Sequence, residues 1–316
     1  MKKFWISFLI SIVIISLIFV GLDKFVFSKE DSPIAGIDEE EDEEEEEDLE
    51  IDKPKQKHKD ELLFLLMGLD AKDVKKSEGT RSDTMMLINI NFKTGKIDLL
   101  SIPRDTRVYI KGKEDKINHA HAYEGAKLSI RTVREFLNID LEYYVKVDYK
   151  AVMEIVEAID GVYIDVPRYM KYDDPTADPP LHIDIKKGFQ LLDGKNSHDF
   201  LRWRQNNDRT VEIGDIGRIE MQQMFMKELV KQTLKPKNIL KIPSFIETYY
   251  DYVETNIPLT LMAKGALSAK NIDTENMVTN TVPGSGKKIA NLHYWIYNVD
   301  ETKEIVREMF KDYLLD

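Results

Sequence analysis

Arginine and aspartate gather in five short clusters between residues 70 and 222 of the chain. The clusters are Asp70; Arg81-Ser82-Asp83; Ser101-Ile102-Pro103-Arg104-Asp105-Thr106; Arg202-Trp203-Arg204; and Asp215 with Arg218 and Gln222. Arg202 and Arg204, two residues apart, share a face of an extended backbone. Arg218 and Gln222, four apart, share a face of a helix. A single arginine at a strand end is usually a surface ion-pair partner, so only convergence of the clusters would make a site.

Convergence of the clusters would place several guanidinium groups around one cavity. The arginines concerned are Arg81, Arg104, Arg202, Arg204 and Arg218. Guanidinium forks match phosphate oxygens two at a time, so such a cavity favours a polyanion. A carboxylate pair such as Asp70 and Asp83 suits Mg²⁺, which takes one or two protein carboxylates and completes its shell with phosphate and water. Arginines with a carboxylate-held Mg²⁺ are typical of pyrophosphate chemistry.

Apolar runs and helical patterns flank the clusters and predict the elements that hold them. Predicted strands cover Glu61–Met67, Thr84–Phe92, Lys96–Ser101, Tyr143–Val147 and Gly161–Val166, and predicted helices cover Glu124–Leu137, Lys150–Ile159 and Asp215–Leu234. Gly95 closes a predicted hairpin turn. A long polar loop containing Pro175 and Pro180 follows residue 166, and three helical or partly helical segments are expected over residues 237–316. Alternating strands and helices predict an α/β fold, a single three-layer α-β-α domain at 61–316 with a central mixed sheet.

The first 27 residues are predicted to form a cytoplasmic N-terminus and a transmembrane anchor. Phe4–Leu22 holds nineteen residues without a charge, which as a helix would be about 29 Å long and would span the hydrocarbon core. A cleaved signal is the alternative, but its apolar region is shorter and ends in small residues, whereas the first alanine here is Ala35. Lys2 and Lys3 predict a single-pass type II protein in the cell membrane, with the rest of the chain exported.

Residues 28–60 carry most of the charge imbalance and are predicted to be a disordered acidic linker. Every residue from Asp38 to Asp48 is acidic, and the formal net charge of the whole chain is -12. Like charges repel and keep such a segment extended. Residues 61–316 are nearly neutral, with 37 basic and 40 acidic groups, which argues against a nucleic-acid partner bound by a broad basic surface. The chain has no cysteine, so disulfides, cysteine zinc sites and thiol nucleophiles are excluded.

Several motifs in this order resemble the LytR-CpsA-Psr family of bacterial cell-wall proteins. They are GLD at 68–70, RSDT at 81–84, SIPRDT at 101–106, KINHAHAYEG at 116–125, YDDP at 172–175, and R-x-R at 202–204 followed by GDIGRIEMQQ at 214–223. The family combines one N-terminal transmembrane helix with an exported α/β domain. The resemblance implies a phosphotransferase that moves a glycopolymer, such as wall teichoic acid or capsular polysaccharide, from an undecaprenyl-pyrophosphate carrier to peptidoglycan.

The resemblance also assigns roles to residues. It implies that Asp70, Asp83 and Asp215 hold Mg²⁺ or Mn²⁺. It implies that the pyrophosphate is bound by Arg81, Arg104, Arg202, Arg204, Arg218 and Gln222. The catalytic residues expected are Arg104, Arg218, Asp83 and Asp105, with either Asp83 or Asp105 taking the proton of a muramic-acid hydroxyl. The lipid tail needs an apolar slot, and the segments Val211–Val230 and Ile239–Phe245 are either its lining or ordinary core.

Two other functions fit the same residues. One is a membrane-tethered protein that binds or senses polyprenyl pyrophosphates without transferring them. The other is a lipid pyrophosphatase, which would release polymer phosphate to water when no peptidoglycan acceptor is present. The products formed distinguish these functions from transfer. In every case the partners expected are the lipid-linked glycopolymer, peptidoglycan and the membrane, with the domain outside the cell facing the wall.

Overall fold

The computed structural model describes residues 58, 60–69, 74–77, 79–176, 180–239, 252–272 and 274–315. All of them belong to one compact unit, Asp52–Asp316. The predicted anchor, nearly all of the predicted linker and Asp70 lie outside the described residues. Among the helices of the described part, none has the length and apolar character needed to cross a bilayer.

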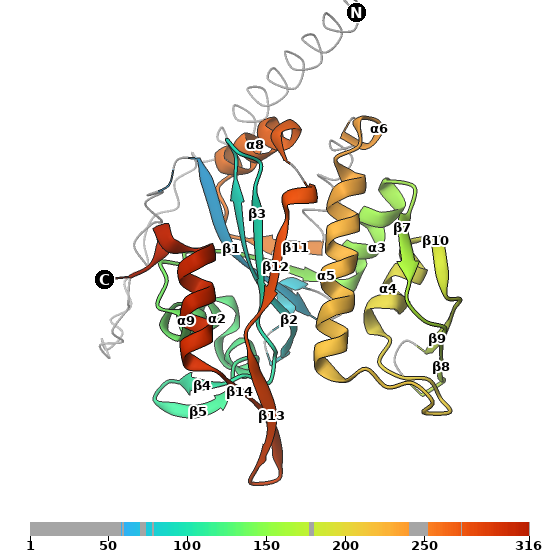
Figure 1. Cartoon of the computed structure of the whole chain (residues 1–316), viewed down its shortest axis with the longest axis horizontal. Helices are drawn as coiled ribbons and strands as arrows, with labels where there is room; N and C mark the ends of the chain where they lie inside the picture. The colour runs from blue at the N-terminus through green and yellow to red at the C-terminus, as the bar shows by residue number, and fades with distance from the viewer. Residues whose placement is uncertain are drawn as a thin grey trace, which may run out of the picture. The chain divides into compact units, whose positions relative to one another are not determined.

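A six-stranded mixed sheet forms the centre of the domain, with the order β11-β6-β1-β2-β3-β12 (Figure 1). Its strands are β1 Glu61–Leu69, β2 Ser82–Asn91, β3 Ile97–Ser101, β6 Tyr143–Asp148, β11 Val253–Thr255 and β12 Val278–Thr281. β2 runs antiparallel to β1 and β3, whereas β6 runs parallel to β1 and β12 runs parallel to β3. The prediction of an α/β domain with a central mixed sheet is therefore confirmed.

Helices cover both faces of this sheet. On one face, α2 His119–Leu137 and α9 Val299–Met309 pack against Leu65 and Leu87. On the other, α5 Gly214–Thr233 brings Met226 against Met86. Successive side chains of a strand point to opposite faces, and this alternation divides the apolar residues of β1 and β2 between two cores. In Figure 1 the sheet stands between α2 and α9 on one side and α5 on the other.

A smaller group of elements packs beside α5. It contains α3 Tyr149–Ala158, β7 Val162–Val166, β8 Met170–Asp174, β9 Leu181–Ile185, β10 Gly188–Leu192 and α4 Gly194–Arg202. Phe200, Trp203 and Phe225 are the large buried side chains of its core. The predicted strand at 161–166 exists as β7, but it pairs with β10 and not with the central sheet. The predicted polar loop is the connection of a β8–β9 hairpin, a pairing that the prolines concealed.

The prediction of three helical or partly helical segments over residues 237–316 omitted the strands of this region. Helices α6 Pro236–Ile239, α8 Leu259–Ser268 and α9 are present, but so are β11, β12, β13 Gly284–Ile289 and β14 Leu292–Tyr297. β12 has the sequence Val-Thr-Asn-Thr, which lacks an apolar pattern, and it is a strand because β3 supplies its partners. The hairpin β4 Arg107–Ile110 and β5 Lys113–Lys116 was also missed, as were the short 3-10 helices Val74–Lys76, Ala269–Asn271, Thr274–Asn276 and Lys311–Tyr313.

The packing of the 3-10 helix Ala269–Asn271 against the β2–β3 turn can be tested at Gly95. We expect Gly95→Ala to lower the free energy of unfolding by at least about 2 kcal/mol more than Gly112→Ala. Both glycines have positive φ, +74° and +76°, so both substitutions strain the backbone. A Cβ at Gly95 would lie 1.7 Å from the backbone oxygen of Asn271, whereas at Gly112 it would meet nothing within 4 Å. Urea unfolding of the two variants measures the difference, and equal losses would contradict the packing of Asn271 on this turn.

Candidate active site

Residues of three of the predicted polar clusters meet at one edge of the central sheet. Asp83 is the second residue of β2, Arg104 follows the end of β3, and Asp215 and Arg218 lie near the start of α5. Because β2 runs antiparallel to β3, its first residues lie at the edge where β3 ends. Segments more than 100 residues apart in the chain therefore contribute to one site, at the lower end of the sheet in Figure 1.

Two arginines and two aspartates form a chain of ion pairs at this edge. Arg104 Nη1 lies 2.6 Å from Asp83 Oδ1, and Arg104 Nη2 lies 3.6 Å from Asp215 Oδ1. The same Asp215 oxygen lies 3.2 Å from Nη2 of Arg218. The Arg218 side chain is only 6% exposed, whereas that of Asp215 is 40% exposed. The arginines thus stand on the buried side of the cluster and the Asp215 carboxylate stands towards solvent.

The two arginines have opposite electrostatic environments. Burial lowers the pKa of Arg218, and the positive charges of Arg104 and Arg204 lower it further, while Asp215 and Asp83 offset only part of this. Burial also opposes the charge of Arg104, but Asp83 beside it, together with Asp215, outweighs burial and raises the pKa. Positive charge is therefore incompletely neutralised around Arg218.

Two buried hydrogen-bond donors in this cluster lack partners. The Nε atoms of Arg104 and Arg218 are inaccessible to solvent, and within the described part of the chain neither reaches a hydrogen-bond acceptor. Buried N–H groups in folded proteins are almost always paired, so each such donor calls for an explanation. An anionic oxygen placed between the guanidinium groups would satisfy them and would supply the missing negative charge.

The remaining predicted arginines differ in their relation to this cluster. Arg204 is exposed and close enough to Arg218 to lower its pKa. Arg202 is half-buried at the end of α4, with its guanidinium carbon 5.8 Å from the centroid of the Tyr149 ring. Trp203 between them is buried in the α4–α5 core, so its neighbours point away from that core. Arg81 is exposed at the entry to β2, and the structure shows no contact that joins it to the other arginines of the described cluster.

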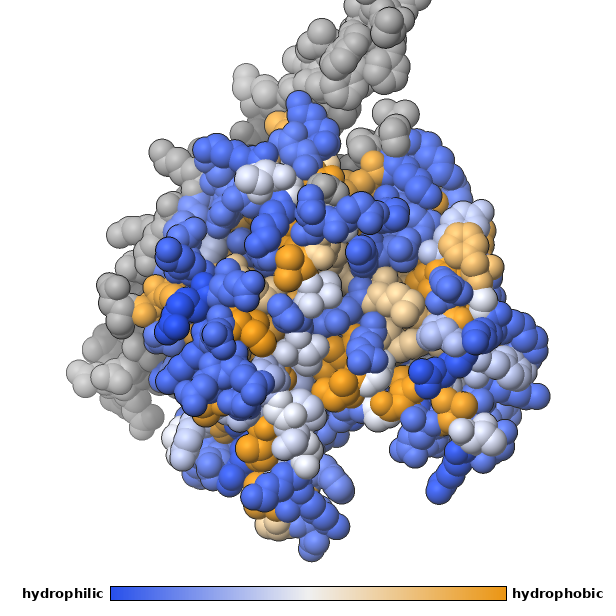
Figure 2. Space-filling view, in the orientation of Figure 1, coloured by the Kyte–Doolittle hydropathy of each residue, from blue (hydrophilic) through white to orange (hydrophobic). Residues whose placement is uncertain are grey.

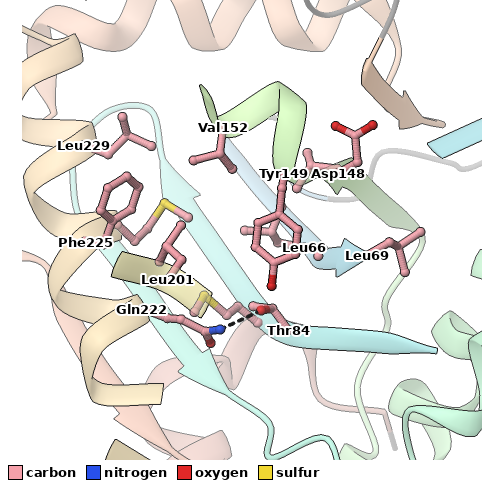
Figure 3. Close-up of a pocket in the computed structure, with 14 residues that line it drawn as sticks. Leu66, Leu69, Thr84, Asp148, Tyr149, Val152, Leu201, Gln222, Phe225 and Leu229 are labelled. Carbon is pink, nitrogen blue, oxygen red and sulfur yellow. Dashed lines mark hydrogen bonds between the residues drawn. The ribbon is translucent and has the colours of Figure 1, made fainter. Parts of the chain in front are cut away.

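A cavity of about 70 Å³ adjoins the arginine cluster. Gln222, one turn after Arg218, donates a 2.9 Å hydrogen bond from Nε2 to Thr84 Oγ1 at its rim. Figure 3 shows side chains of α5 facing those of α3 and β1 across the cavity. Its lining includes Leu66, Leu69, Met86, Val147, Val152, Leu201, Phe225, Met226 and Leu229. This space is almost wholly apolar, so it suits a hydrocarbon group rather than a charged one.

The cavity includes part of the segment that was predicted either to line a lipid slot or to belong to the core. The segment 211–230 supplies four of its lining residues, and Phe225 among them also belongs to the hydrophobic core beside α4. The two interpretations of this segment are therefore compatible. The second segment proposed as lining, Ile239–Phe245, lies outside the residues whose side chains are described. Tyr149 and Thr84 line the cavity but were missed, because only the fold brings them to it.

Asp105 points away from the ion-pair chain. Its Oδ1 lies 2.9 Å from Nζ of Lys116, on the strand β5 that the sequence did not predict. Asp83 is therefore in contact with Arg104 at the centre of the cluster, whereas Asp105 is held at its margin.

The carboxylates present have the chemistry of a magnesium site. Within the described residues no three His, Cys, Asp or Glu side chains are close enough to hold a metal by themselves. Mg²⁺ does not need three, because it commonly binds one or two carboxylates and fills its shell with phosphate oxygens and water. Asp83 and Asp215, which share Arg104 as a partner, fit this pattern.

Comparison with protein families and curated sequences gives consistent results. The LytR_cpsA_psr family model matches residues 26–311. A Bacillus cereus protein named polyisoprenyl-teichoic acid--peptidoglycan teichoic acid transferase TagU is 31% identical over 308 residues, which cover 95% of this chain and 94% of the relative. The Bacillus subtilis protein of the same name is 28% identical over 253 residues, with 79% and 78% covered.

Solved structures share this architecture. Bacillus subtilis TagV superposes with a TM-score of 0.68 at 27% identity, over 82% of this chain and 100% of the other. A structure described as TagT bound to LI-WTA superposes with a TM-score of 0.63 at 25% identity, over 81% and 91%. Both likenesses cover more than four fifths of this chain.

Proposed function

The chain belongs to the LytR-CpsA-Psr family, and from this premise we propose that it transfers an anionic glycopolymer, such as wall teichoic acid, from an undecaprenyl-pyrophosphate carrier to a hydroxyl of peptidoglycan. The names of its relatives support the reaction class. The observation that carries the proposal is the pair of buried Nε donors on Arg104 and Arg218, which lack partners among the described residues. Thr84, next to Asp83, and Gln222, one turn after Arg218, line an apolar cavity. A pyrophosphate joined to a hydrocarbon tail matches both features.

In this reaction the acceptor oxygen attacks the phosphorus next to the polymer, and the bond to the bridging oxygen breaks, so undecaprenyl phosphate leaves. Negative charge grows on the bridging and non-bridging oxygens. Arg104, Arg204 and Arg218 would hold these oxygens, and Arg202 would approach from the end of α4. Because Arg218 is buried and already paired, its donors are fixed before the substrate arrives and need little reorganisation during the reaction.

Asp83 and Asp215, with Asp70 as a further candidate, would hold Mg²⁺ against the pyrophosphate. The ion would neutralise charge on the phosphate oxygens and polarise the phosphorus. Arg104 bridges both carboxylates, so it sets their separation. Of the two aspartates considered as the base, Asp83 is the better placed, because it lies within the arginine cluster in contact with Arg104, whereas Asp105 contacts Lys116 at the margin.

The apolar cavity would receive the part of the lipid nearest the pyrophosphate. We expect Val152→Phe, which fills the cavity from α3, to raise KM for a long polyprenyl donor about tenfold, because lost apolar contact of this size costs about 1–3 kcal/mol. A donor with a short prenyl chain should lose less. Val299→Phe is the matched control, since Val299 is 47% exposed on α9. Equal KM values for the long donor in both variants would argue against tail binding here.

Transfer itself is tested with the full-length protein in detergent or vesicles, a labelled polymer on a pyrophosphate lipid, and peptidoglycan. We expect label on peptidoglycan and release of the lipid monophosphate. Free polymer phosphate in place of labelled peptidoglycan would indicate a lipid pyrophosphatase. Tight binding without any product would indicate a binding or regulatory protein.

The proposal also requires the domain to face the cell wall. The N-terminal anchor predicted at residues 4–22 lies outside the described residues, so its topology is tested separately. A reporter that is active only outside the cytoplasm, fused to the C-terminus, should be active. A silent reporter would remove the cell-wall function.

A further inference from the structure

The β13–β14 hairpin is an arm that projects from the domain at the same sheet edge as the arginine cluster (Figure 1). β12 runs parallel to β3, so the chain leaves both strands at one edge: β3 leads to Arg104, and β12 leads to β13. The arm consists of two antiparallel strands of six residues each. At 3.4 Å per residue it extends about 20 Å from its base.

The base of the arm is fixed to the loop that carries Arg104. The backbone N–H of Trp295 donates to the backbone oxygen of Asp105 at 2.8 Å, and its indole Nε1 donates to Val282 O at 3.1 Å. At Gly284, a Cβ would lie 2.4 Å from the oxygen of Ile296, so the strands approach more closely than a side chain allows. The arm therefore keeps a set position relative to Arg104, although a free two-stranded hairpin is only marginally stable.

Positive charge gathers on this arm and at its base. Lys287 lies directly opposite Tyr294 in the strand register, and Lys288 lies opposite His293. Arg107 and Lys116 approach the ring of the same Tyr294, at 5.6 and 5.8 Å from its centroid. Tyr294 therefore lies among cations of two hairpins, β4–β5 and β13–β14.

Among the described residues, carboxylates form ion pairs with the cations at the base of the arm but not with the lysines of β13. Arg107 pairs with Glu114, and Lys116 pairs with Asp105. Lys287 and Lys288 are exposed, and no carboxylate of the described residues lies within 4.0 Å of either ammonium group. In Figure 2 the projecting part of the surface shows hydrophilic residues together with some apolar ones. The outer half of the arm therefore carries two lysines that the described carboxylates do not neutralise, and these form a short cationic strip on an arm whose base lies beside the loop of Arg104.

We propose that this strip binds phosphate groups along the polymer chain of the donor, as that chain leaves the pyrophosphate site. The inference rests on the proposed function for its substrate, and it adds a separate binding site for the polymer. Lys287 and Lys288 are consecutive residues of β13 and point to its opposite faces, so a flexible chain with repeated phosphates can contact both where it crosses the edge of the arm. A peptidoglycan acceptor is less suited, since its carboxylates are not spaced along one extended backbone of negative charge.

The first experiment measures binding of poly(glycerol phosphate) of defined length to the full-length protein, with a neutral glycan of similar size as the reference. We expect Lys287→Glu/Lys288→Glu to weaken polymer binding at low ionic strength by at least about tenfold, and Lys287→Gln/Lys288→Gln to weaken it less. Added salt should reduce the difference. The control, Lys127→Glu/Lys303→Glu, makes the same change of net charge at exposed positions on α2 and α9.

The second experiment compares donors with long and short polymers. The arm variant should raise KM for the long donor and leave transfer from the short donor as in the wild type. Unchanged binding of the polymer, a similar loss in the control, or a loss confined to peptidoglycan binding would each overturn the proposal. If the wild type transfers no donor at all, the proposed function fails, while the binding measurement still tests the arm.

Discussion

Replacing Arg218 by methionine should lower the rate of polymer transfer by about 10²–10³-fold, the usual loss when one fixed donor to a developing negative charge is removed. Arg218 is the most buried arginine of the cluster, and its Nε has no acceptor among the described residues. Methionine has a similar length and no charge, so it removes the donors while filling most of the space.

The same substitution should leave the thermal midpoint of unfolding unchanged or raise it. Burial and the neighbouring arginines lower the pKa of Arg218, which means that the folded state disfavours its charged form relative to the unfolded chain. At neutral pH, below both pKa values, the guanidinium is charged in both states and its burial costs free energy. Asp215, the partner left behind, is 40% exposed and can be hydrated. A loss of activity together with retained stability would mark Arg218 as a residue kept for ligand binding.

Two control variants sharpen this test. Arg218→Lys keeps the positive charge but loses Nε and the planar fork, so we expect most of the activity to be lost as well. Arg131→Met changes an exposed arginine on α2 that pairs with Glu135, and it should leave transfer unaltered. Full activity of Arg218→Lys would show that charge alone suffices, and the two-point contact with phosphate would then be excluded.

Asp83→Asn should cost about 10²–10³-fold in kcat, whereas Asp105→Asn should cost less than about tenfold. Asp83 contacts Arg104, and Asp105 follows Arg104 in the chain. Both substitutions keep the shape of the side chain and remove one negative charge. Asp83 contacts Arg104 at 2.6 Å within the cluster, but Asp105 contacts Lys116 at its margin. Single-turnover rates with saturating donor separate these effects from changes in binding.

The dependence on Mg²⁺ adds a second readout to this pair. If Asp83 helps to hold the ion, Asp83→Asn should need a higher Mg²⁺ concentration for half-maximal activity, while Asp105→Asn should keep the wild-type value. The reverse order of losses would assign the central role to Asp105 and would remove Asp83 from the reacting groups.

Strands that carry several apolar residues within their own sequence could be predicted from that sequence. Glu61–Met67 and Thr84–Phe92 were placed within two residues of β1 and β2, because each carries enough buried apolar side chains to specify a central strand. Strand β12 was missed because its residues are mostly polar and its partner, β3, is distant in sequence. Strands β13 and β4 pair with the next strand along the chain, but β13 is mostly polar and β4 has only four residues. Residues 161–166 were predicted correctly as a strand, but their local pattern does not show that this strand pairs with β10 and not with the central sheet.

The sequence by itself determined the chemistry available to this protein: arginine and aspartate clusters at element ends, an acidic segment before a nearly neutral body, and no cysteine. Only the tertiary structure decided which of these groups meet. Arg104 and Asp105 are neighbours in the chain, yet one points to Asp83 and the other to Lys116. Consecutive side chains diverge, and their partners lie on strands that are brought close by sheet pairing and by burial of apolar surface, neither of which a local motif records.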